Sequence, residues 1–422
     1  MARVMGRTRQ VLLLAASAAL ITLALTPVAM ADSSAANPFL LQFGSPGAGN
    51  GQFDSYGPIG VAVDPKSGDV YVSDYLGDRI EKFDSSGNYL SQWGSYGWGA
   101  SQFNGPIGVA VDPNTSDVYV TDFYNHRVQK FDSSGNFLTA FGSPGTSPGE
   151  FNGPNGVAVD PKTGDVYVTD NSNGRVEVFD SSGNYLSQFG SPGDGNGQLD
   201  QPVAISLDPT SEDVYVTDYN TSRIQKFDSS GNYLSQFGTH GTGPGQFNGS
   251  YGVAVDPLSR DVYVSDFYNN RVEDFDSAGN YLSQFGTAGT GPGQFDNPIA
   301  VTVDPSNGDV YVADFDNDRV EKFGPVSAPV TPISLCQSTV GDVEGSARYQ
   351  ALPTNMKNAV NLILNSACNQ LGTITPRLNA NQVAFAVAIY KRAVTALAAG
   401  GWLTSAQAST LSTLAGEITV GS

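Results

Sequence analysis

Charged side chains recur at fixed positions along this chain. An aspartate lies two residues after a Val-Tyr-Val motif in six places, and an arginine follows it five residues later, with successive copies 48 residues apart. The aspartates are Asp74, Asp122, Asp170, Asp218, Asp266 and Asp314, and the arginines are Arg79, Arg127, Arg175, Arg223, Arg271 and Arg319. A ring of carboxylates could bind cations or a ligand. However, a residue present in every copy serves the copy itself, so we interpret the two rows as structural pairs that hold a turn between strands.

Histidines that could bind zinc are sparse. The two histidines, His126 and His240, belong to different copies of the repeat, whereas zinc sites generally need three or four ligands. Oxygen-bearing side chains alternate from Asp194 to Asp200, as they do in calcium loops, but the equivalent stretches of other copies lack the acids. We therefore expect no cofactor, with calcium as the weaker alternative. The spacing identifies no nucleophile with a nearby base.

Residues that differ between the copies are better candidates for ligand binding. They lie in the loop after each Val-Tyr-Val motif and at the start of the innermost predicted strand. The candidates are Tyr75, Phe123, Tyr124, His126, Asn155, Tyr219, Tyr251, Phe267, Tyr268 and Phe315. Aromatic and amide groups on one rim are suited to a peptide or a carbohydrate, through stacking and hydrogen bonding. The alternative is that these side chains pack between neighbouring copies.

Four short strands in each copy must position these residues. In the first copy, strands are predicted over 59–63, 69–73, 79–83 and 89–93, and residues 85–88 predict a hairpin turn. The first two strands are apolar throughout, which is typical of sheets covered on both faces. Four antiparallel strands in a 48-residue repeat predict one blade of a β-propeller.

The two ends of the repeat region predict how the ring closes. The sixth copy lacks its fourth strand, because Gly324-Pro325 replaces the turn that precedes that strand elsewhere. An unpaired version of the strand, Phe39–Phe43, precedes the first complete copy. Pairing it with Val320–Phe323 would close the ring and remove two exposed sheet edges. The sequence therefore predicts a mainly β protein, a six-bladed β-propeller with four-stranded antiparallel blades, over residues 38–324.

The repeated phrase also resembles a known family. In the first copy, Gly60 to Asp84 reads G-V-A-V-D-P-K-S-G-D-V-Y-V-S-D-Y-L-G-D-R-I-E-K-F-D, which resembles the NHL repeat of secreted bacterial proteins. The resemblance covers all six copies and implies the propeller fold. NHL propellers include RNA-binding modules, an extracellular sensor domain and a zinc-dependent lyase, and related propellers include an antibiotic-opening lyase and lactone hydrolases. The fold therefore does not identify an activity.

The net charge and the N-terminus restrict the partners. A net charge of -20 at pH 7 argues against nucleic acid, because phosphate binding needs clustered basic residues. Arginines before an apolar run at 11–25, followed by Ala29-Met30-Ala31, predict a signal peptide over residues 1–31 with cleavage near Ala31. We expect a secreted, monomeric protein without stable membrane insertion after cleavage.

The composition changes after the sixth copy. Residues 325–335 form a Pro-rich stretch that predicts an extended linker, and residues 336–422 show helical periodicity that predicts a small all-α domain. This domain contains both cysteines, Cys336 and Cys368, which predict one disulfide in an exported protein.

Together, these features predict a binding module rather than an enzyme. The propeller would bind an extracellular protein, peptide or glycan on one rim. The alternatives are a lyase or hydrolase with its site on the same rim, and a structural spacer that presents the helical domain at the cell envelope.

Overall fold

The computed structural model describes residues 37–325. The predicted signal peptide, the predicted helical domain and the cysteine pair Cys336 and Cys368 lie outside the described residues, as does most of the predicted linker. Within the described range, no helix combines the length and the hydropathy that are needed to cross a membrane.

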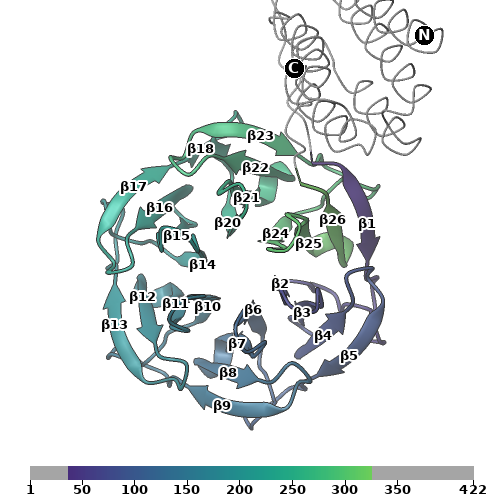
Figure 1. The fold of residues 1–422 in the computed structure, drawn as a ribbon, viewed down its shortest axis with the longest axis horizontal. Helices are drawn as coiled ribbons and strands as arrows, with labels where there is room; N and C mark the ends of the chain where they lie inside the picture. The colour runs from purple at the N-terminus through teal and green to yellow at the C-terminus, as the bar shows by residue number, and fades with distance from the viewer. Residues whose placement is uncertain (1–36, 326–422) are drawn as a thin grey trace, which may run out of the picture. The chain divides into compact units, whose positions relative to one another are not determined.

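Six antiparallel sheets of four strands each surround a central axis, with their innermost strands facing one another (Figure 1). Each sheet is a propeller blade, and the blades are numbered 1 to 6 in chain order. The mainly β, six-bladed propeller predicted from the repeat is thus confirmed.

In blades 1 to 5 the four strands follow one another along the chain from the innermost to the outermost position, and in blade 6 the outermost strand is β1. Blade 1 contains β2 (Val61–Val63), β3 (Val70–Asp74), β4 (Arg79–Phe83) and β5 (Tyr89–Trp93). Blade 2 contains β6 (Pro106–Val111), β7 (Val118–Asp122), β8 (Arg127–Phe131) and β9 (Phe137–Phe141). Blade 3 contains β10 (Pro154–Val159), β11 (Val166–Asp170), β12 (Arg175–Phe179) and β13 (Tyr185–Phe189). Blade 4 contains β14 (Pro202–Leu207), β15 (Val214–Asp218), β16 (Arg223–Phe227) and β17 (Tyr233–Phe237). Blade 5 contains β20 (Ser250–Val255), β21 (Val262–Asp266), β22 (Arg271–Phe275) and β23 (Tyr281–Phe285). Blade 6 contains β24 (Pro298–Val303), β25 (Val310–Asp314), β26 (Arg319–Phe323) and β1 (Phe39–Phe43).

Short elements occupy the loops. A parallel pair, β18 (Thr239–His240) and β19 (Gln246–Phe247), lies in the connection between blades 4 and 5. Single turns of 3-10 helix follow the second strand in four blades, namely η1 (Phe123–Asn125), η2 (Asn171–Asn173), η3 (Phe267–Asn269) and η4 (Phe315–Asn317).

The N-terminal strand closes the ring. β1 pairs antiparallel with β26, with Phe39 opposite Phe323 and Phe43 opposite Val320. One further backbone bond, from the N–H of Gly324 to the carbonyl oxygen of Pro38 at 2.8 Å, extends this junction. The sixth blade is therefore built from both ends of the repeat region, as the missing strand predicted.

Packing between the blades explains why the Val-Tyr-Val strands do not alternate apolar and polar residues. In blade 1, Val70 and Val72 are buried against Tyr311 of blade 6, whereas Tyr71 is buried on the other face against Phe131 of blade 2. Each blade is covered on both sides, so both faces of its inner strands must be apolar. Burying one such side chain contributes about 1.5–3 kcal/mol.

The predicted strand boundaries differ from the structure mainly at the inner strand of blade 1. The strands over 79–83 and 89–93 are confirmed, but β3 is shifted by one residue and β2 begins at Val61 instead of residue 59. Blade 1 has two additional residues, Ser55 and Tyr56, before this strand. The inner strands of the other five blades are each six residues long, so the irregular start of β2 coincides with the insertion.

Candidate functional site

The repeated aspartates and arginines form one ion pair in every blade. A guanidinium nitrogen lies 2.8–2.9 Å from a carboxylate oxygen in all six pairs. The pairs are Asp74–Arg79, Asp122–Arg127, Asp170–Arg175, Asp218–Arg223, Asp266–Arg271 and Asp314–Arg319. All six aspartates are buried. Removing one partner of such a pair would leave a buried charge uncompensated, at a cost of about 3–5 kcal/mol.

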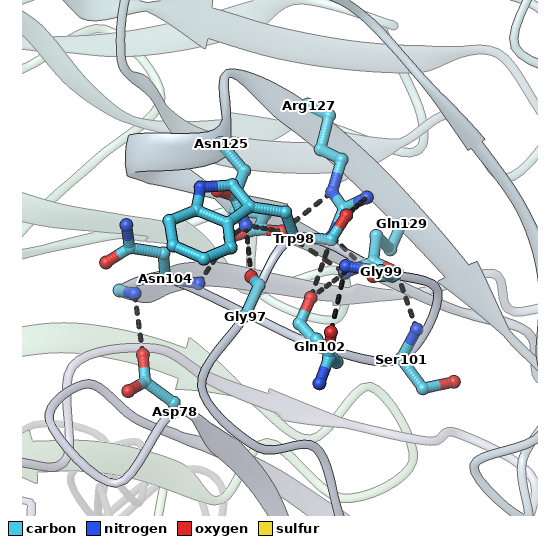
Figure 2. A network of polar contacts seen from close by, with 12 residues as sticks. Asp78, Gly97, Trp98, Gly99, Ser101, Gln102, Asn104, Asn125, Arg127 and Gln129 are labelled. Atoms are coloured by element: carbon cyan, nitrogen blue, oxygen red, sulfur yellow. Dashed lines mark hydrogen bonds and ion pairs between the residues drawn. The ribbon is translucent and has the colours of Figure 1, made fainter.

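Each of these arginines also holds the glycine-rich connection that enters its blade, as Figure 2 shows for Arg127. Its Nη1 donates to the carbonyl oxygen of Trp98 at 2.9 Å, and its Nη2 donates to the carbonyl oxygens of Gly99 at 2.7 Å and Gln102 at 2.8 Å. The arginines of the other five blades donate to equivalent carbonyl oxygens. The repeated aspartates and arginines thus hold in place the backbone of the connections between blades.

A second buried acidic row lies on the third strands. Its members are Glu81, Glu177, Glu273 and Glu321. Burial raises the pKa of each to about 7, although the arginine that begins the same strand opposes this shift. Blades 2 and 4 have Gln129 and Gln225 at the equivalent positions. A neutral side chain therefore fits this position of the blade.

His126 links two blades. Its Nδ1 accepts a hydrogen bond from the backbone N–H of Gly153 in blade 3 at 3.1 Å. The equivalent Asp78 and Asn270 accept backbone N–H bonds from the next blade at 2.9 Å and 2.8 Å. A side chain at this position therefore joins neighbouring blades by accepting a hydrogen bond, and Asp, His and Asn can each do so. His240 lies in β18 and is exposed.

The loop with alternating oxygen-bearing residues takes part in the same framework. The carbonyl oxygen of Asp194 accepts from Arg223 Nη1 at 2.7 Å, and the N–H of Asp200 donates to Asp218 Oδ1 at 2.8 Å. Among residues 37–325, no three His, Cys, Asp or Glu side chains are grouped so that they could hold a metal ion.

The variable residues lie on one face of the propeller, which we call the rim face. It is formed by the loops that follow the second strands and by the connections between blades. In blade 2, the N–H of Tyr124 donates to the carbonyl oxygen of Asn104 at 3.1 Å, and Asn125 Nδ2 donates to that of Gly97 at 2.8 Å. These bonds join the loop and the connection into one surface.

Two pairs of tyrosines stand on opposite sides of the rim face. The hydroxyl oxygens of Tyr75 in blade 1 and Tyr124 in blade 2 are 3.0 Å apart. Tyr219 in blade 4 and Tyr268 in blade 5 form the equivalent hydrogen bond, three blades further round the ring. Burial and the hydroxyl partner raise the pKa of both Tyr75 and Tyr219. Tyr124 and Tyr268 are 53% and 54% exposed.

A glycine makes room for each tyrosine pair. Gly105 has φ +69°, and a Cβ there would lie 2.9 Å from the ring of Tyr75 and 3.0 Å from that of Tyr124. Gly249 has φ +83°, with the rings of the second pair 3.2 Å and 3.4 Å from the same point. A larger residue would strain the backbone and push the rings apart.

Further aromatic rings connect the second pair to blade 1. Ring centroids are separated by 5.7 Å between Tyr219 and Tyr251, 5.9 Å between Tyr251 and Phe267, and 6.2 Å between Phe267 and Phe315. Phe315 in turn lies 5.9 Å from Tyr56. The series covers blades 4, 5, 6 and 1, so these side chains both pack against neighbouring blades and line the rim face.

The rim face is amide-rich at blade 3. Asn155 is buried at the start of β10, and its side chain makes a hydrogen bond with the hydroxyl of Tyr251 from blade 5. Burial raises the pKa of that hydroxyl, and the bond to Asn155 opposes the shift. This bond joins blades 3 and 5, which are not neighbours in the ring. Phe123 packs edge-on against Tyr124 at 5.0 Å. Ring and hydroxyl contacts thus join aromatic candidates from several blades, whereas Asn155 is buried and His126 accepts a backbone bond from the next blade.

The sequence reasoning missed three exposed aromatic residues in the connections that enter blades 1 and 2. Tyr56, Tyr96 and Trp98 are 60%, 58% and 68% exposed. An alignment of the six glycine-rich connections would have revealed two of them. The other connections have Pro46, Pro144, Pro192, His240 and Ala288 in place of Tyr96, and Ala48, Thr146, Asp194, Thr242 and Thr290 in place of Trp98.

Comparison with known proteins identifies the repeat. The NHL repeat family matches residues 103–131, 151–179, 199–227 and 295–323. None of the curated proteins compared with the chain matches it.

Solved structures with a similar fold include two proteins from Bacteroides thetaiotaomicron. One is of unknown function, with 17% identity, a TM-score of 0.53, and coverage of 69% of this chain and 75% of that one. The other is described as an auxiliary nutrient binding protein, with 16% identity, a TM-score of 0.50, and coverage of 64% and 69%. Virginiamycin B lyase from Staphylococcus aureus shares 15% identity, with a TM-score of 0.45 and coverage of 64% and 84%.

Likeness at these identities shows the fold alone. The NHL repeat matches segments of four blades, and the strand register together with the closure of the sixth blade shows a six-bladed β-propeller of four-stranded antiparallel blades.

Proposed function

We propose that this protein is a secreted binding module that holds an extracellular protein, peptide or glycan on its rim face without catalysing a reaction. One observation carries the proposal. The framework of each blade is nearly the same in all six copies, whereas the residues mounted on the rim face differ and are mostly aromatic. The fold does not need aromatic residues at these positions, because blade 3 has Asn171, Ser172 and Asn173 in the same loop.

The chemistry of the rim face suits a partly apolar ligand. Tyr124 and Tyr268 each present an exposed ring and a hydroxyl that is held by its partner tyrosine. A tyrosine held in this way loses little conformational entropy on binding, and it offers both an apolar surface and a hydrogen-bonding group. The two pairs stand on opposite sides of the ring, so one ligand lying across the centre of the rim face could contact both.

The export features support an extracellular partner. Basic residues, an apolar run and an Ala-x-Ala site at residues 1–31 are typical of a signal peptide. The net charge of -20 disfavours polyanionic partners such as nucleic acid.

The proposal is tested by screening the purified full chain against arrays of glycans and peptides and then comparing variants on whatever binds. We expect Tyr124→Ala and Tyr268→Ala each to weaken binding by about tenfold or more, as is typical of central aromatic contacts. Leu186→Ala is the matched control, because Leu186 is 49% exposed on the outer strand β13, away from the rim face. Equal binding by the parent and both tyrosine variants would remove the support for this site.

A further inference from the structure

The most exposed aromatic pair in the described part of the chain lies on the connection between blades 1 and 2. Trp98 and Tyr96 are 68% and 58% exposed. Their ring centroids are 5.5 Å apart with an interplanar angle of 66°, an edge-to-face contact. Such a contact limits the orientations that the two rings can adopt.

The backbone beneath the pair is held firmly. Arg127 Nη1 donates to the carbonyl oxygen of Trp98 at 2.9 Å, and Asn125 Nδ2 donates to that of Gly97 at 2.8 Å (Figure 2). Tyr96 forms a β-bridge with Phe103, which is buried. The two side chains therefore project into solvent from a fixed support rather than from a free loop.

The repeat itself shows that the fold does not need these rings. Five equivalent connections make the same bridge and receive an equivalent arginine bond to a loop carbonyl, yet none has Phe, Tyr or Trp at either position. Exposed tryptophan on a protein surface favours association. A structural role thus fails to explain the pair, and a binding role explains it.

The connection that carries the pair has no charged side chain between residues 94 and 105. Gly97, Gly99, Ser101, Gln102 and Asn104 lie in the same connection. The nearby Arg127 is engaged with Asp122 and with carbonyl oxygens, as described above. The overall charge of -20 opposes anionic ligands.

From this combination we infer that Tyr96 and Trp98 form a binding site for a neutral polysaccharide. The C–H groups on one face of a pyranose ring carry slight positive charge and stack on the negative face of an aromatic ring. The sugar hydroxyls would bond to the amides and hydroxyls of the connection. Tyr124 contacts the same connection through its N–H bond to Asn104, so the site continues toward the Tyr75–Tyr124 pair. The inference rests on the proposed function only in that the rim face binds extracellular ligands.

The test uses the full chain with cellohexaose, maltohexaose and chitohexaose as probes. Binding is measured by titration calorimetry. Tryptophan emission is recorded for the parent and for the variant that lacks Trp98, so that a shift to shorter wavelength at Trp98 is separated from the signals of Trp93 and Trp402. The key variant combines Tyr96→Pro and Trp98→Thr, which are residues that this chain already uses at the equivalent positions of other connections. The melting temperature of this variant should equal that of the parent within error, because the substitutions are on the surface and fit the same loop.

We expect at least one neutral hexaose to bind the parent, and the double variant to bind it at least about tenfold more weakly. Equal affinity of parent and variant would overturn the inference, and so would the failure of all three hexaoses to bind the parent. Binding of a protein or peptide that is lost in the double variant would also overturn it, since the pair would then be a protein contact. A peptide or protein ligand lost only in Tyr124→Ala would leave the proposed function standing while this inference fails.

Discussion

Asp274 is the clearest exception to the repeat. Four other blades have a lysine at this position, 2.7–2.9 Å from an aspartate and 5.0–5.1 Å from the centroid of a buried tyrosine ring. These lysines are Lys82, Lys130, Lys226 and Lys322. Blade 5 instead places Asp274, which is 2% exposed, near the carboxylate of Asp261. Its Oδ1 has no hydrogen-bond partner.

This arrangement should destabilise the folded protein at neutral and higher pH. Burial, and then the charge of Asp261, raise the pKa of Asp274 from 3.8 to about 7. Because the folded state binds this proton more tightly than the unfolded state, the free energy of unfolding falls as the pH rises through that interval. At about 1.4 kcal/mol per pH unit, the cost is about 4 kcal/mol at pH 8 and about 1 kcal/mol at pH 4.5.

Two substitutions test this reasoning. Asp274→Asn removes the charge, and at pH 8 we expect it to raise the free energy of unfolding by about 2–4 kcal/mol, with a gain near 1 kcal/mol at pH 4.5. Asp274→Lys should raise the free energy of unfolding at pH 8 by at least as much, because the lysine can pair with Asp261 and lie over the ring of Tyr263, as the lysines of four other blades do with their equivalents. The measurement is urea unfolding at both pH values, with the loss of β-sheet monitored by circular dichroism. A gain that is the same at the two pH values, or a loss with Asp274→Lys at pH 8, would refute the reasoning.

Other predictions follow from the same internal comparison. Glu81→Gln should leave the free energy of unfolding at pH 8 unchanged or raise it by up to about 3 kcal/mol, because burial raises the pKa of Glu81 to about 7. In blade 2, Gln129 occupies the equivalent position, and its Nε2 donates to the carbonyl oxygen of Gln102 at 2.7 Å. A loss of about 3–5 kcal/mol, as expected for a broken buried ion pair, would contradict this. Gly105→Ala should weaken ligand binding by the rim face, because the new Cβ crowds the rings of Tyr75 and Tyr124. Gly68 has a similar positive φ but no aromatic ring nearby, so Gly68→Ala should lower the stability and leave binding unchanged. Deleting residues 37–43 should expose the edge of β26 and give aggregates in size-exclusion chromatography; a monomer with the parent melting temperature would disprove the role of β1.

The fold was predictable because one signal was repeated six times. Period and turn chemistry predicted the strands. The missing fourth strand of the sixth copy required a partner, and Phe39–Phe43 supplies it. The start of β2 was misplaced, because apolar character alone cannot show where pairing begins after an insertion such as Ser55-Tyr56. The buried Glu81 row was also overlooked. A carboxylate on an alternating strand suggests a solvent-facing position, but the third strand is covered on both faces.

The rim face was predictable only in outline. Variation between copies points to the residues, but their distances depend on how the blades close around the axis. The hydroxyl contact between Tyr75 and Tyr124 joins two blades, and so does the contact of Tyr219 with Tyr268; no local pattern states such a pairing. His126 illustrates the opposite problem. Its residue type suggests chemistry, whereas its Nδ1 accepts a backbone bond from the next blade.

The most direct test of the central claim is hydroxyl-radical footprinting of the full chain with and without a ligand recovered from the arrays. If the rim face binds that ligand, the oxidation rates of Tyr124 and Tyr268 should fall severalfold, because both rings are about half exposed in the free protein. The rate at Leu186 on the outer strand β13 should not change. Unchanged rates at both tyrosines with the ligand bound at saturation would contradict the account.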